Sequence, residues 1–160
     1  MTPNASLPWG RIAAQAVVAG IAGAILIDLY LWAVTIAPNH GSILTMWQWV
    51  ASTAFGKGAF ANPSFAWVGL GLHVAVSIGW AGGYAFAAAT RPFLSQRWPI
   101  SGLAYGIVVY LLMQIVLLVD GNFALPAGAT AVIVALVGHC IFFGVPVALI
   151  VRLMQGRATA

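Results

Sequence analysis

Four polar side chains within long apolar stretches are the residues of this chain best suited to chemistry. They are Asp28, His73, Gln114 and His139, and Asp28 is one of two acidic residues among 160. A carboxylate inside a membrane span costs roughly 2.5–3.5 kcal/mol on the most lenient insertion scale, so it needs a partner or a function. Aspartate and histidine form the usual proton relays in membranes, because imidazole titrates near neutral pH. These residue types predict a site for a proton, a cation or a small polar ligand.

Four apolar stretches are long enough to position these side chains inside a membrane. About 20 helical residues cross the ~30 Å hydrocarbon core of a bilayer. Prolines lie at or between the ends of the stretches, as expected where helices end. We predict four transmembrane helices over residues 12–36, 66–88, 100–119 and 129–151.

The segment 42–60, between the first two spans, is mildly amphipathic. Trp47 and Trp49 within it suit the membrane–water interface, where aromatic rings gather. We therefore expect an interfacial helix there. The predicted fold class is an all-α integral membrane protein: a four-helix transmembrane bundle with one interfacial helix, in a single membrane domain over residues 1–160.

The composition favours a membrane protein over a soluble domain. The chain is 62% hydrophobic and 5% charged, whereas a soluble domain has about 25% charged residues. Its net charge of +4 comes from scattered residues, which form no patch for nucleic acid. The lipid bilayer is the expected partner, a homo-oligomer or a larger membrane complex stays open, and no nucleic acid is expected.

The positive charges predict the orientation of the spans. Five of the six lie on the side shared by both termini and the loop between the second and third spans, and Lys57 lies on the other side. Lysine and arginine accumulate in cytoplasmic loops, so we expect both termini to be cytoplasmic. The five are Arg11, Arg91, Arg97, Arg152 and Arg157.

Helical periodicity places the polar side chains toward the interior of the bundle. Residues four apart share a helix face, so Ser77 lies on the face of His73 and Tyr110 on the face of Gln114. At about 1.5 Å per residue, the four polar residues lie within roughly 7 Å of one another in depth, in the outer half of the bilayer. This common depth predicts one polar constellation.

Small residues at four-residue spacing predict the faces on which the spans pack closely. One such stripe leads to Asp28 along the first span, which indicates that the carboxylate faces protein. The predicted packing residues are Gly20, Gly79, Gly83, Gly102 and Gly106.

Several interpretations of the polar residues stay open. A hydrogen-bond network between Asp28 and His73 would fix helix register without chemistry. A polar cavity open to the outside would bind a proton or small ligand and transport or relay it. A third interpretation is an accessory subunit that packs against a larger membrane complex.

A cofactor or an enzyme is less well supported by the residues. Asp28, His73 and His139 have the composition of a metal site, and the two histidines could be axial ligands of haem. No sequence-local metal spacing accompanies them, so no cofactor is predicted. The motifs of common hydrolases are absent from the sequence, so enzyme activity is uncertain and disfavoured.

Several short motifs carry a resemblance to a known group of proteins. They are WQWVAS at 47–52, FG at 55–56, GLGLH at 69–73, GxxYGxxxYxxM at 102–113 and HxxxxGxP at 139–146. Over residues 11–153 the chain resembles a group of small, uncharacterised bacterial inner-membrane proteins with four transmembrane helices. The resemblance implies a multi-pass protein of the bacterial cytoplasmic (inner) membrane. It implies no activity, cofactor or residue role.

Overall fold

The computed structural model describes residues 7–119 and 128–156, and every regular element in these ranges is a helix. Four helical stretches there are long and apolar enough to cross a membrane. They are Trp9–Asn39, Phe65–Thr90, Trp98–Val119 and Ala129–Gly156. The four predicted spans are therefore confirmed by length and composition, and each of them extends beyond its predicted bounds at one or both ends. Asp120 and Arg157 lie outside the described residues.

The first long stretch begins as a regular helix and ends irregularly. Helix α1, Trp9–Leu31, continues into a π-helical segment, η1, Trp32–Ile36, and a 3-10 turn, η2, Ala37–Asn39. His40 then adopts a left-handed conformation with φ of 52°. This conformation is uncommon for a residue with a Cβ and marks a tight turn. The chain thus leaves the first span abruptly.

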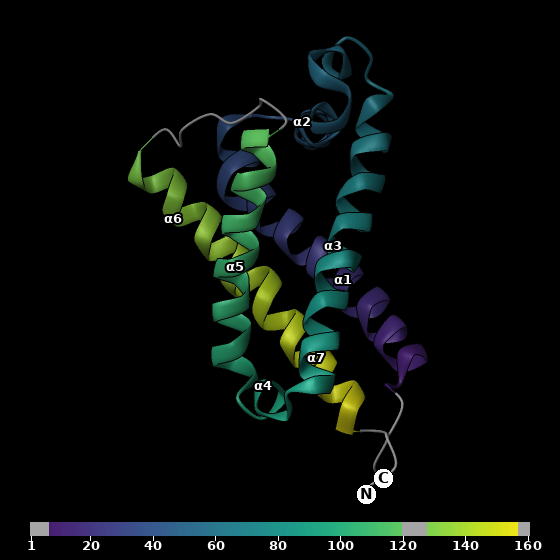
Figure 1. The fold of residues 1–160 in the computed structure, drawn as a ribbon. Coiled ribbons are helices and arrows are strands. Elements are labelled where there is room, and N and C mark those ends of the chain that lie inside the picture. The colour runs from purple at the N-terminus through teal and green to yellow at the C-terminus, as the bar shows by residue number, and fades with distance from the viewer. Residues whose placement is uncertain (1–6, 120–127, 157–160) are drawn as a thin grey trace, which may run out of the picture.

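The predicted helix between the first two spans is present and shorter than expected. Helix α2, Ile43–Phe55, is capped by Ser42, whose hydroxyl accepts a hydrogen bond from the Leu44 amide at 3.2 Å. A serine cap satisfies one of the free amides at a helix start. A 3-10 segment, η3, Gly56–Phe60, follows. Figure 1 shows α2 nearly end-on beside the upright α3, so the two helices cross at a steep angle.

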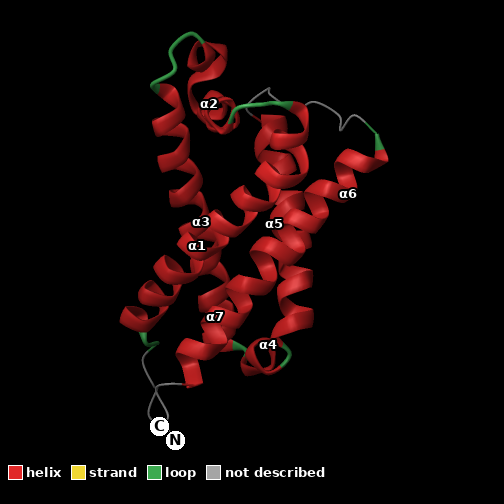
Figure 2. Cartoon of the chain, turned by 180° about the vertical axis from the view of Figure 1, so that it is seen from behind, coloured by secondary structure: helices red, strands yellow, loops and turns green. Residues whose placement is uncertain are grey.

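Two further spans and a short connector complete one side of the molecule. Helix α3, Phe65–Thr90, is followed by α4, Pro92–Gln96, and α5, Trp98–Val119. Figure 2, from the opposite side, also places α4 at the end of the molecule where α1 starts and α7 finishes. Arg11, Arg91, Arg97 and Arg152 therefore lie at one end, and Lys57 lies at the other, beyond α2.

The last span is interrupted by a π-helical segment. Helix α6, Ala129–Val137, passes into η4, Gly138–Gly144, and then into α7, Val145–Gly156. Pro146, the second residue of α7, has no amide hydrogen to donate to the preceding turn. Insertion of a wider turn before a proline relieves this break in the hydrogen-bond ladder. His139 and Cys140 lie inside the wide segment.

Small residues let the helix backbones approach at particular crossings. A Cβ at Gly20 in α1 would lie 2.5 Å from the Cα of Ile78 in α3, and a Cβ at Gly102 in α5 would lie 2.8 Å from the Gly144 carbonyl oxygen. A Cβ at Gly106 would overlap the backbone of Cys140. Such close contact is the usual way in which transmembrane helices associate.

Gly79 and Gly83 differ from the expected packing role. A Cβ at Gly79 would meet nothing within 4 Å, and one at Gly83 would make only an ordinary contact, 3.4 Å from the Tyr105 hydroxyl. The face of α3 that packs on α1 is instead formed around Ser77 and Ile78. The spacing of small residues identified Gly79 and Gly83 as a stripe on α3, but it did not identify the face of α3 that packs against α1.

Candidate functional site

The Asp28 carboxylate meets side chains from two other helices. Its Oδ1 atom lies 3.1 Å from Nε2 of His73 in α3, and its Oδ2 atom accepts a hydrogen bond from the Trp47 indole of α2 at 3.3 Å. Asp28 is 9% exposed. Oδ1 and the His73 Nε2 are buried, and neither forms a well-aligned hydrogen bond to any described residue. The contact between them is therefore the only polar interaction described for these two atoms.

Two glycine crossings hold these three helices at the required distance. The α1–α3 crossing at Gly20 lies two turns before Asp28, and a Cβ at Gly69, one turn before His73, would overlap the Trp47 carbonyl. A side chain at either glycine would separate the helices that carry the contact. The polar site is therefore positioned by backbone contacts and not by its own hydrogen bonds alone.

A groove between α1, α2 and the start of α3 gives access to the carboxylate. Its volume is about 460 Å³. Asp28 is the charged residue among those that line it, and Trp32 and Trp47 supply aromatic walls. The remaining lining residues are Ile25, Leu29, Ile43 and Leu70. The Asp28 carboxylate thus lies at the side of a mostly apolar groove.

A second polar cluster joins the third and fourth spans. The Gln114 amide donates a hydrogen bond to the Tyr110 hydroxyl at 3.2 Å, and the Tyr110 ring packs edge-on against the His139 ring with centroids 5.5 Å apart. Nδ1 of His139 lies 2.8 Å from the Ala135 carbonyl oxygen. If this ring nitrogen carries the proton, Nε2 is left as the acceptor.

The four polar residues thus form two groups and not one hydrogen-bonded constellation. No hydrogen bond or ion pair among the described residues connects Asp28 and His73 to Gln114 and His139. Ser77 is buried, at 4% exposure, at the α1–α3 crossing and makes no hydrogen bond to either group. Their similar depth predicted that the four polar residues are neighbours. Their side chains point in different directions around their helices, so they form two separate groups.

Within residues 7–119 and 128–156, no three His, Cys, Asp or Glu side chains lie close enough together to hold a metal ion. Asp28 and His73 would supply two ligands, and His139 is turned toward Tyr110 and its own helix. The hypothesis that these residues bind a metal or haem stays untested.

The site contains one residue that the sequence did not indicate. Trp47 was expected only as an interfacial aromatic, yet its indole donates to Asp28. No periodicity within one helix reveals this contact, because it depends on where α2 crosses α3.

Comparisons with protein-family models, with curated proteins and with solved structures find no match.

Proposed function

We propose that this multi-pass membrane protein binds a proton, or a small cation in exchange for it, at the Asp28–His73 pair. The observation that carries the proposal is the 3.1 Å contact between these two titratable groups at the edge of an open groove. A carboxylate and an imidazole so close share their protons, so each changes the affinity of the other. Such pairs inside membranes are the chemical basis of proton relays and coupled transporters.

The groove supports exchange from one side of the membrane. Asp28 lies toward the end of the molecule that carries α2, whereas the opposite half of the α1–α3 contact is closed by the backbone approach at Gly20. Movement of a proton or ligand past this crossing requires the helices to separate. Transport by this chain would therefore alternate between an outward-open groove and a second state.

The proposed location is the bacterial cytoplasmic (inner) membrane with both termini in the cytoplasm. Four described arginines lie at the end that contains the termini, and Lys57 lies at the other, which follows the rule that positive charge stays inside. In this orientation α2 and the groove face the periplasm, and the tryptophans of α2 lie at the outer interface.

Titration of the tryptophan fluorescence tests the binding of a proton. The Trp47 indole reports the charge of Asp28, because it donates to that carboxylate. The purified protein is titrated over the range in which carboxyl and imidazole groups ionise, about pH 4 to 8. We expect a transition in wild type that is lost in Trp47→Phe and in Asp28→Asn. His73→Gln should shift its midpoint.

A matched control separates this pair from other buried histidines. His139→Gln removes an imidazole of a span that has no hydrogen bond to Asp28, so it should leave the transition in place. In proteoliposomes, Asp28→Asn should also abolish proton flux measured with an enclosed pH dye. If Asp28→Asn keeps the wild-type transition, the proton-binding proposal fails.

A structural role is a second candidate, because the same contacts tie α2, α1 and α3 together. In that case Asp28→Asn would unfold at lower denaturant, and wild-type vesicles would show no flux at any pH. An accessory subunit would further copurify with a larger complex from native membranes.

A further inference from the structure

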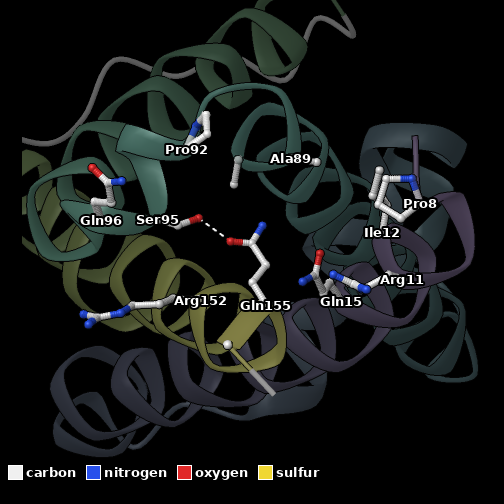
Figure 3. Close-up of a pocket in the computed structure, with 12 residues that line it drawn as sticks. Pro8, Arg11, Ile12, Gln15, Ala89, Pro92, Ser95, Gln96, Arg152 and Gln155 are labelled. Atoms are coloured by element: carbon white, nitrogen blue, oxygen red, sulfur yellow. Dashed lines mark hydrogen bonds between the residues drawn. The ribbon is translucent and has the colours of Figure 1, made fainter. Parts of the chain in front are cut away.

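A second pocket lies at the arginine end of the molecule, far from the groove at Asp28. It has a volume of about 660 Å³ and lies between the start of α1, the end of α3, α4 and the end of α7 (Figure 3). Its polar lining residues are Arg11, Gln15, Ser95, Gln96, Arg152 and Gln155.

We propose that this pocket binds a phosphate-bearing anion. Two arginines line it and no carboxylate does. In the described part of the chain neither Arg11 nor Arg152 has an ion-pair partner, since the Asp28–His73 contact is the ion pair found there. In the view of Figure 3 the two arginines lie on opposite sides of Gln155. Guanidinium groups recognise phosphate through paired N–H donors, so two unpaired arginines favour an anion.

Two anchored amides determine which polar atoms remain for a ligand. The Ser95 hydroxyl donates to Oε1 of Gln155 at 2.5 Å, so the Gln155 amide nitrogen is left as a donor. The Gln15 amide nitrogen donates to the Val151 carbonyl at 3.2 Å, so its Oε1 atom is left as an acceptor. Gln15 is 1% exposed, and its orientation is fixed by this bond. The pocket thus offers several donors for phosphate oxygens.

The remaining walls of the pocket are apolar. Pro8, Ile12, Ala88 and Ala89 contribute them near the ends of two spans. This combination suits the head group of an anionic phospholipid with its glycerol portion against the apolar wall, and it also accommodates a soluble phosphate monoester. Basic pockets between transmembrane helices bind such head groups.

Binding is tested with the purified full chain in a neutral detergent. Native mass spectrometry counts bound phosphatidylglycerol against phosphatidylcholine, and thermal stability is measured with glycerol 3-phosphate and with inorganic phosphate. We expect one phosphatidylglycerol per chain, held about tenfold more weakly after Arg11→Gln or Arg152→Gln, because a charged hydrogen bond is lost. Stabilisation by glycerol 3-phosphate without retention of lipid identifies a soluble ligand of the same chemistry.

Two arginines at the same end provide matched controls. Arg91 and Arg97 flank α4 and do not line the pocket, so Arg91→Gln and Arg97→Gln remove the same charge from the same end. These variants should retain the ligand. Gln96→Trp, which keeps every charge and fills part of the pocket, should lose it. Equal effects of all four arginine substitutions indicate general attraction to anionic lipid and overturn the proposal. Retention of the ligand by Gln96→Trp also overturns it.

Discussion

Gly20→Ala should destabilise the bundle and disturb the Asp28 site together. The new Cβ would lie 2.5 Å from the Ile78 Cα, 2.7 Å from its amide nitrogen and 2.9 Å from the Ser77 carbonyl oxygen. Carbon atoms prefer a separation of about 3.5 Å or more, so α1 and α3 must separate by roughly 1 Å. Overpacking of this kind costs about 1–3 kcal/mol. The helix-forming advantage of alanine recovers at most about 1 kcal/mol.

The same separation should reach the polar pair. If α1 moves by roughly 1 Å, the ionic contact between Asp28 and His73 lengthens from 3.1 Å to about 4 Å, which weakens the electrostatic interaction between the two groups. The fluorescence transition that depends on Asp28 should then shift along with the unfolding midpoint. A loss of stability without this shift would show that the crossing and the site are not mechanically coupled.

Gly79→Ala is the matched control, since it makes the same substitution in α3, the helix against which Gly20 packs. Its Cβ would meet nothing within 4 Å, so stability should be unchanged or slightly increased. Unfolding of both variants is followed in mixed detergent micelles by circular dichroism. Equal stability of Gly20→Ala and Gly79→Ala would refute the backbone contact at Gly20.

Three further predictions concern other parts of the molecule. Tyr105→Phe removes the hydrogen bond from the Tyr105 hydroxyl to the Trp80 carbonyl and should lower the free energy of unfolding by about 0.5–1.5 kcal/mol in the same assay. A fluorescent protein fused to the C-terminus should be bright and an alkaline phosphatase fused there inactive; the reverse result would invert the proposed orientation. The purified protein should show no Soret band after addition of haem, whereas a band that disappears in His139→Ala would favour the haem interpretation.

The number of spans could be predicted because it depends on local properties. Length and apolar composition define a membrane helix, and both are read directly from the sequence. The ends were harder, since η1 and η2 continue the first span with widened and tightened turns that no propensity indicates. The helix after the first span was expected over residues 42–60, but a regular α-helix occupies only Ile43–Phe55.

The contact between Asp28 and His73 was within reach of sequence reasoning, because a membrane carboxylate requires a partner and two histidines, His73 and His139, lay at similar depth. Its third member, Trp47, was not, since that contact depends on a crossing between helices. Depth also failed to separate His139 from the pair, because depth gives no information on the direction of a side chain around its helix. The pocket at the arginine end was not predicted, because its lining residues come from three stretches that are far apart in the sequence.

The wide turn from Gly138 to Gly144 has a consequence for the rest of its span. A π-helical turn holds an additional residue, so every position after it is rotated by about 100° compared with an uninterrupted α-helix. Val147 and Val151, both fully buried, are directed into the core only because of this offset. Deletion of a single residue from 138–144 would convert the segment to ordinary helix and turn that apolar face away from its neighbours. The same deletion would rotate Arg152 and Gln155 out of the pocket at the arginine end. The wide turn therefore determines which way every later side chain of this span faces.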